Sequence, residues 1–361
     1  MFSLLPFTSF FIFLMIFGTF ISISSFNWLF VWVGLEVNLM GFIPLLVYSG
    51  KCSSAESGVK YFLIQALGSS LFAGGSCLVF GSMSSLDLVF GLIGSSFLDS
   101  YYMFSTVLIL SSLFLKLGCF PFYFWLPSVV LGTSWFSCFF LLTWQKLAPF
   151  FILLSVGVSF FSVGYWLMSV FAVFSSLFGG IGGIGETYLR SILAYSSIGH
   201  SGWMLYSGLL GFSTFCVYFF IYFFISACLF VILSFLGSKN MGYVGCFSKS
   251  LVFKFSMMGI LLSLGGMPPL LGFFGKWVVL SNGMMSGGAL PIFLLILGSL
   301  LSLYYYLVLF FGVFFSSGSF LFSVNSTMNL MGNDGNFSIF LLVMAVGMVN
   351  LFGAALCFVF I

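Results

Sequence analysis

Long uncharged apolar segments follow one another along the chain, and they constrain its fold more than any other feature. Of the 361 residues, 62% are hydrophobic and 4% are charged, against roughly 25% charged residues in an ordinary globular protein. Nine Lys and Arg with six Asp and Glu cannot solvate the surface of a globule of this length. A surface that faces lipid needs no such solvation, so we predict an all-α polytopic membrane protein.

The same features exclude several classes of function. The apolar runs are continuous rather than alternating, which excludes a β-barrel, and no basic run exists to hold nucleic acid. Neither CxxCH, a cysteine cluster nor a helically spaced His pair is present to bind haem, iron–sulfur clusters or metal. The segment GGIGGIGE (179–186) has no preceding strand and no Lys-Ser/Thr, so we do not interpret it as a nucleotide-binding loop. We therefore expect no cofactor in this chain.

About eleven membrane-spanning helices are expected, because each needs roughly 20 apolar residues. Gly and Pro interrupt the ninth span and follow the fourth, so both helices are predicted to be discontinuous. We expect a single membrane domain, 1–361, made of two five-helix inverted repeats, about 4–156 and 160–316, and a C-terminal helix at about 337–360. The expected spans, with boundaries good to several residues, lie near 4–23, 27–49, 60–81, 101–120, 134–156, 160–182, 190–211, 214–236, 251–283, 290–316 and 337–360.

Basic residues in the loops orient the chain. The connections after odd-numbered spans contain no Lys or Arg, only Asp87 and Asp99. Since basic loops stay on the negative side of a membrane, we place the N-terminus in the cytoplasm or mitochondrial matrix and the C-terminus on the opposite side. The connections after even-numbered spans contain Lys51, Lys60, Arg190, Lys239, Lys249 and Lys254.

Four charged residues remain well inside spans: Glu36, Lys116, Lys146 and Lys276. Each is unfavourable by about 2.5 to 3.5 kcal/mol at mid-bilayer, and intramembrane charges generally serve ion pathways. A lysine, unlike an arginine, can take up and release a proton when it is buried. We interpret the four as a proton relay, with alternatives for three of them. Glu36 could form a structural ion pair, Lys116 could reach the interface from a helix end, and Lys276 could be an interfacial anchor beside Trp277.

His200 is the only histidine, and it lies in the middle of a span. Ser196, His200, Trp203 and Ser207 recur at helical spacing and so share one polar face. An imidazole there can relay protons or can hydrogen-bond a neighbouring helix. Protonatable groups without a redox centre or nucleotide site can move protons or cations only when another component supplies the energy.

Six stretches covering spans two to nine resemble the subunit 2 family of mitochondrial NADH:ubiquinone oxidoreductase (respiratory complex I), in its animal form. The chain departs from the family pattern at Gly185-Glu186 and at Phe120-Pro121, away from the four charges. The stretches are WVGLEVNLMGFIPLL (32–46), KYFLIQALGSSL (60–71), KLGCFPFYFWLPSVV (116–130), LLTWQKLAPF (141–150), GGIGGIGETYLRSILAYSSIGHSGWML (179–205) and SLGGMPPLLGFFGKW (263–277).

The resemblance implies an antiporter-like proton-pumping subunit of the complex I membrane arm, in the mitochondrial inner membrane. It places Glu36, Lys116, Lys146 and Lys276 on the family's relay positions and His200 between the last two. Lys60 matches a family position near a span start and could belong to the input side of the relay; a plain interfacial anchor is an equal alternative. FMN, iron–sulfur clusters and ubiquinone are then expected in partner subunits. Neighbouring antiporter-like subunits and lipids such as cardiolipin are the expected partners.

Two other functions compete with this one. A cation/proton antiporter subunit would share the charge pattern, but an ion gradient would drive it. A purely structural membrane spacer is disfavoured by the four buried charges, because apolar replacements would be less unfavourable there.

Overall fold

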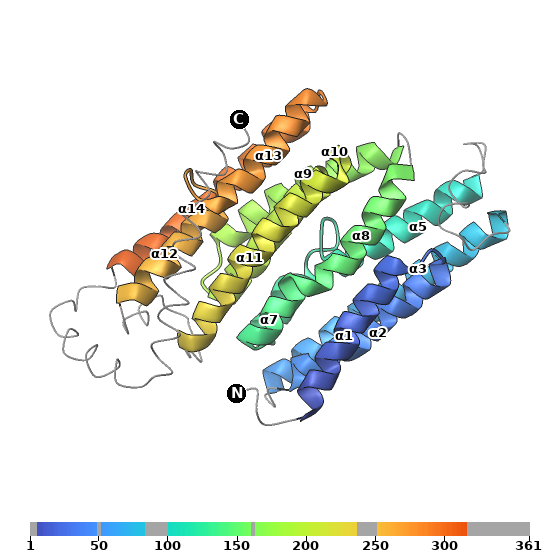
Figure 1. The fold of residues 1–361 in the computed structure, drawn as a ribbon, viewed down its shortest axis with the longest axis horizontal. Coiled ribbons are helices and arrows are strands. Elements are labelled where there is room, and N and C mark those ends of the chain that lie inside the picture. Colours follow the sequence, from blue (N-terminus) through green and yellow to red (C-terminus); the bar gives the residue numbers. More distant parts are fainter. Residues whose placement is uncertain (1–5, 49–51, 84–99, 160–162, 237–250, 316–361) are drawn as a thin grey trace. The chain divides into compact units, whose positions relative to one another are not determined.

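The structure, a computed structural model, describes residues 6–48, 52–83, 100–159, 163–236 and 251–315 (Figure 1). These residues form helices joined by short connections, and none of them lies in a β-strand. The chain divides into two compact units, Met1–Ser175 and Ser176–Ile361, which are described separately. The continuously apolar runs of the sequence therefore form helices, as predicted.

The first unit is a bundle in which α3 packs against α2, α5 and α6, and α8 packs against α1, α5 and α7. The helix α9 continues from this unit into the second. The helices are α1 (Pro6–Ser24), α2 (Trp28–Val47), α3 (Cys52–Met83), α5 (Ser100–Leu117), α6 (Trp125–Gly132), α7 (Trp135–Leu142), α8 (Trp144–Ser159) and α9 (Val163–Ile184).

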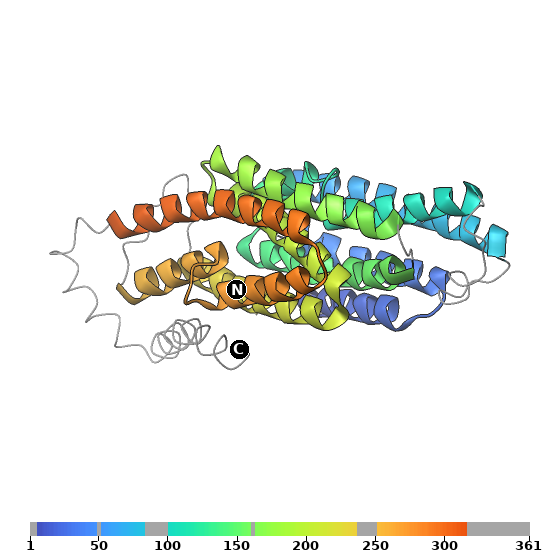
Figure 2. The same ribbon diagram turned by 90° about the horizontal axis from the view of Figure 1, so that it is seen from above.

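Helices α1 and α2 run side by side and touch backbone to backbone (Figures 1 and 2). A Cβ atom on Gly18 would lie 2.5 Å from the backbone nitrogen of Asn38. A Cβ atom on Gly34 would lie 2.6 Å from the backbone nitrogen of Ser22. Small residues permit such close approach between membrane helices. The close packing holds α2, which carries Glu36, tightly against α1.

We expect Gly34→Ala to destabilise the first unit, because the added methyl group would collide with the backbone of α1. Overpacking of this kind is destabilising by about 1 to 3 kcal/mol. The matched control is Gly74→Ala in α3, where an added Cβ meets no atom within 4 Å. Thermal stability of the purified protein in detergent measures the difference. Equal melting temperatures for the two variants would contradict the prediction.

The second unit contains α10 (Leu189–Leu210), α11 (Phe212–Leu236), α12 (Leu251–Gly265), α13 (Leu271–Met285) and α14 (Ala289–Phe315). A Cβ atom on Gly179 would lie 2.5 Å from the backbone of Gly199 in α10, and one on Gly183 would meet the ring of Tyr305 in α14. The glycines at 179–183 lie within the helix α9 and allow close packing there. Their placement therefore differs from that of a phosphate-binding loop, which lies between a strand and a helix.

Most of the expected spans coincide with helices. Seven helical segments of the described residues are long and apolar enough to cross a membrane, counting α7 and α8 together as Trp135–Ser155. Helix α10, which carries Arg190, His200 and five serines, is not among the seven. The segment 337–360 lies outside the described residues, so the count of eleven stays a prediction.

Two details of the sequence-based prediction were wrong. The expected third span begins at 60, whereas α3 begins at Cys52, so Glu56 and Lys60 lie within a helix rather than in a loop. The fifth span is also interrupted, at Thr143, where φ is −119° and ψ is −68°. The side-chain hydroxyl of Thr143 donates a hydrogen bond of 2.6 Å to the carbonyl of Phe139, so a carbonyl next to the break has a hydrogen-bond partner.

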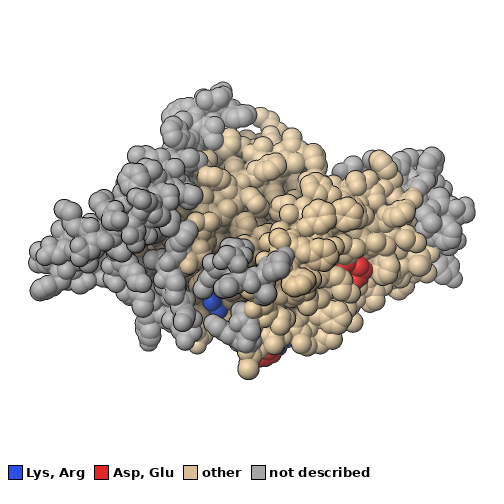
Figure 3. Space-filling view, turned by 60° about the horizontal axis from the view of Figure 1, so that its bottom comes forward, with Lys and Arg blue, Asp and Glu red and all other residues tan. Residues whose placement is uncertain are grey.

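Many large apolar side chains lie on the outside of the helices. Phe20, Trp166 and Phe220 are 63%, 68% and 69% exposed. On the face shown in Figure 3, the charged side chains of the described residues form only small patches. Such a surface suits contact with lipid rather than water.

Candidate functional site

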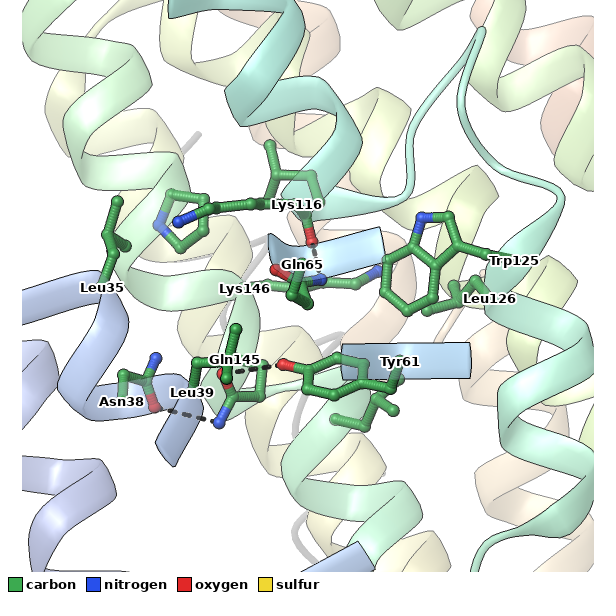
Figure 4. A pocket seen from close by; sticks show the side chains of 13 residues that line it. Leu35, Asn38, Leu39, Tyr61, Gln65, Lys116, Trp125, Leu126, Gln145 and Lys146 are labelled. Carbon is green, nitrogen blue, oxygen red and sulfur yellow. Dashed lines mark hydrogen bonds between the residues drawn. The ribbon is translucent and has the colours of Figure 1, made fainter. Parts of the chain in front are cut away.

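A small cavity in the first unit brings together Lys116 and Lys146 (Figure 4). Its volume is about 20 Å³, which is room for about one water molecule. Trp125 of α6 also lines the cavity. The polar side chains that line it come from α2, α3, α5 and α8 and are Asn38, Tyr61, Gln65, Lys116, Gln145 and Lys146.

Lys116 lies in the last turn of α5, whose end is fixed by neighbouring side chains. The helix ends because Gly118 adopts φ +67°, a conformation that favours glycine. The indole nitrogen of Trp125 donates to the carbonyl of Leu115 at 3.1 Å, and the amide of Gln65 donates to the carbonyl of Lys116 at 3.4 Å. The carbonyl of Leu115 also accepts from the backbone N–H of Gly118 at 3.2 Å, so Trp125 adds a second bond there, and Gln65 supplies a partner for the carbonyl of Lys116. Lys116 is 7% exposed, so it is buried.

Glu36 lies on α2, next to the cavity-lining residue Leu35. It interacts electrostatically with Lys116, but the two do not form an ion pair within 4.0 Å. Among the described residues, the oxygen Oε1 of Glu36 is buried and has no hydrogen-bond partner. The expected alternative of a structural ion pair is therefore not seen for Glu36 in this part of the chain.

Lys146 lies in the first turn of α8, directly after the break at Thr143. Its side chain is buried, with 2% exposed. The two helix interruptions of this unit therefore place both lysines at the same cavity.

Lys276 lies in α13 of the second unit and is 7% exposed. Its ammonium nitrogen donates a hydrogen bond of 2.9 Å to the carbonyl of Gly265, the last residue of α12. It also lies 5.9 Å from the centroid of the Trp203 ring, within the range of a cation–π contact. The carbonyls at the end of a helix attract a cation. The side chain of Lys276 is thus directed at the end of α12.

His200 and Lys276 border one aromatic cluster in the second unit. The nitrogen Nδ1 of His200 lies 2.9 Å from the hydroxyl of Tyr218, and this pair joins α10 to α11. The rings of Tyr218 and Trp203 are parallel, with centroids 6.4 Å apart. Since Trp203 also faces the ammonium of Lys276, the histidine and the lysine contact neighbouring members of the cluster. The hydroxyls of Ser196 and Ser207 instead bond carbonyls of their own helix.

Lys60 is not part of the cavity. It is 46% exposed and forms an ion pair with Glu56, one turn earlier in α3. This is the one ion pair within 4.0 Å among the residues that the structure describes. Exposed pairs of this kind contribute little to stability.

Asn38, Tyr61 and Gln65 were not among the predicted site residues, because they carry no charge in an apolar span. An amide in an apolar span is also unfavourable unless it is hydrogen-bonded. That signal was present in GLEVNLMG (34–41) and in KYFLIQALG (60–68). No group of three His, Cys, Asp or Glu side chains that could hold a metal occurs among the described residues.

The fold and the site define a class: polytopic α-helical membrane proteins that bury lysines beside interrupted helices. A family model described as "NADH:quinone oxidoreductase/Mrp antiporter, TM" matches residues 25–303. The chain belongs to this family and, within it, to the NADH-ubiquinone oxidoreductase chain 2 proteins. It is 37% identical to the chain 2 protein of Anopheles gambiae over 308 residues, which cover 84% of this chain and 85% of that one. It is 35% identical to that of Lumbricus terrestris, covering 81% and 82% of the two chains.

Solved structures share the fold. A chain of respiratory complex I from Thermus thermophilus, solved with bound aureothin, superposes with a TM-score of 0.78 at 25% identity, covering 96% of this chain and 78% of that one. A chain of the Mrp complex from a Dietzia species gives a TM-score of 0.74 at 19% identity, covering 84% and 59%. The second likeness concerns the fold alone.

Proposed function

We propose that this chain is a core membrane-arm subunit of proton-translocating NADH:ubiquinone oxidoreductase, and that its buried lysines carry protons across the membrane. The observation that carries the proposal is the cavity shared by Lys116 and Lys146. Two buried amines around a space for water can exchange a proton, and neither needs to face bulk solvent. Membership of the chain 2 family supports the identity of the parent enzyme.

The proposed sequence starts at Glu36, whose charge acts on Lys116. Redox chemistry in other subunits changes the local charge, which alters the balance between the ammonium and the neutral amine of Lys116. The proton that Lys116 gives up passes through water in the cavity to the neutral amine of Lys146. Lys276, together with His200, accepts the proton in a later step of the relay. Lys60 has no role in this relay, because its partner is the exposed carboxylate of Glu56.

The wider assignment is part of the same proposal. FMN, iron–sulfur clusters and ubiquinone are bound by partner subunits, and other antiporter-like subunits and lipids such as cardiolipin lie beside this chain. The protein is placed in the mitochondrial inner membrane, with its N-terminus on the matrix side and its C-terminus in the intermembrane space. The excess of basic residues in the expected even-side loops supports this orientation.

The two inverted repeats, 4–156 and 160–316, are also proposed. Each contains a helix that ends beside a buried lysine. Helix α5 ends next to Lys116, and α12 ends at the carbonyl that Lys276 binds. Paired interrupted helices are typical of transport proteins built from such repeats.

A cation/proton antiporter subunit is the second candidate, favoured by the fold shared with the Mrp complex. Purification from native membranes in mild detergent separates the two functions. We expect the chain to copurify with a flavin- and iron–sulfur-containing assembly that acidifies one side of vesicles when NADH is added. Purified chain that exchanges Na⁺ or K⁺ for protons alone in liposomes, without such an assembly, would contradict the proposal.

A further inference from the structure

Four uncharged polar residues link the helices around the cavity. The amide nitrogen of Gln145 donates to the oxygen Oδ1 of Asn38 at 3.0 Å, and the hydroxyl of Tyr61 donates to the oxygen Oε1 of Gln145 at 3.4 Å. Both bonds are drawn in Figure 4, with the bond from Gln65 to the carbonyl of Lys116. We call Asn38, Tyr61, Gln65 and Gln145 the amide–phenol frame.

Two members of the frame adjoin a relay lysine, and a third shares its helix with Glu36. Asn38 follows Glu36 by two residues on α2, and Gln145 directly precedes Lys146 on α8. Tyr61 and Gln65 are four residues apart on α3, so they share one face of that helix. Gln65 bonds the backbone of Lys116 itself. The frame therefore connects the helices that carry Glu36, Lys116 and Lys146.

Three members of the frame are buried, and Gln145 is partly exposed. Asn38, Tyr61 and Gln65 are 3%, 2% and 6% exposed. A buried amide or hydroxyl that loses its partner keeps the full penalty of desolvation. Amides do not titrate and a phenol ordinarily titrates near pH 10, so the frame can order the site without storing the proton.

Resting on the proposed function, we propose that Tyr61 and Gln145 are positioning residues for proton transfer between Lys116 and Lys146. The amide of Gln145 is held from both ends, by Asn38 on α2 and by Tyr61 on α3. The backbone of Lys146 is thereby fixed across the cavity from Lys116, whose own backbone is held by Gln65. Both lysines then line one small cavity with their backbones held in place, while their side chains run in different directions in Figure 4. Loss of the frame increases the variation in the positions of the two lysines, and proton transfer between them through water becomes less frequent.

The test uses the assembled complex in sealed membrane vesicles and measures protons pumped per NADH oxidised. Tyr61→Phe removes one oxygen and keeps the ring, which packs on Phe42 and Trp125 at centroid distances of 5.3 and 5.9 Å. Gln145→Leu removes both hydrogen bonds of the amide. We expect each variant to slow proton transfer through this chain about fivefold, the usual effect of one neutral hydrogen bond, and so to lower the ratio. The double variant should be no worse than Gln145→Leu alone, because both changes break the same chain of bonds.

The matched control is Ser112→Ala on α5. The hydroxyl of Ser112 is fully buried, but it bonds Ile109 of its own helix at 2.6 Å. We expect it to leave the ratio unchanged. A purely structural role for the frame would lower the amount of assembled complex and leave the ratio per NADH as in the wild type, and that result would overturn the inference. Lys146→Met, measured in parallel, separates the two proposals. If it lowers the ratio while the frame variants do not, only the frame is rejected; if it has no effect, the proposed function is rejected.

Discussion

Replacing Lys146 with methionine is expected to stop NADH-driven proton translocation through this chain. Methionine keeps much of the length and volume of the side chain, but it has no proton to exchange. Removing a group that accepts and donates a proton slows that step by about 10²-fold or more. Lys146 is 2% exposed and shares its cavity with Lys116, so bulk water does not readily replace it as an acceptor.

The measurement is the pH gradient formed per NADH oxidised, normalised to the amount of assembled complex. Lys146→Arg distinguishes charge from proton exchange, because arginine keeps the charge and does not release its proton. We therefore expect Lys146→Arg to stop proton translocation as well. Ser155→Ala, on the same helix and exposed, is the control and should pump normally, since its hydroxyl bonds only its own helix at Ile152. Wild-type pumping by Lys146→Met would rule out the assigned relay.

Neutralising Glu36 is expected to have the second largest effect. Two unit charges 4 Å apart interact by about 4 kcal/mol near a protein surface. The separation of Glu36 and Lys116 exceeds that of an ion pair, so we expect an interaction energy of about 2 kcal/mol between the two charges. Loss of that energy changes the ratio of charged to neutral Lys116 about thirtyfold. Glu36→Gln keeps the shape of the side chain and removes this interaction, so pumping should fall severalfold.

A double-mutant cycle tests whether Glu36 acts through Lys116. If it does, Glu36→Gln has no further effect on pumping in a Lys116→Met background. Independent, additive losses would show instead that the carboxylate acts on another group. The companion Glu36→Asp keeps the charge and should retain more pumping than Glu36→Gln.

The positions of the charges could be predicted from the sequence because charge is so unfavourable in lipid. Glu36, Lys116, Lys146 and Lys276 stood out in runs of apolar residues, and the structure buries all three lysines. Helical spacing also placed His200 on a polar face, although its partner Tyr218 lies on another helix and could not be identified. The functional roles of these residues stay predictions that the experiments above address.

The neutral part of the site could not be predicted in the same way. Asn38, Gln145 and Tyr61 are 107 and 84 residues apart along the chain where they bond, and no spacing rule connects such distant positions. The break at Thr143 was also missed, since no Gly or Pro adjoins it, and Pro149 lies more than one turn further on. Both features depend on how helices pack, which local sequence patterns do not specify.

The backbone contact between α1 and α2 limits how Glu36 can move. Sliding one helix along the other would bring bulkier residues to the close backbone contacts now made at Gly18 and Gly34. Relative sliding of the two helices is therefore unfavourable. Any change in the separation of Glu36 and Lys116 during turnover then requires rotation of a side chain or movement of α5, which carries Lys116. The distance over which the carboxylate acts is thus set by the position of α5 against the α1–α2 pair.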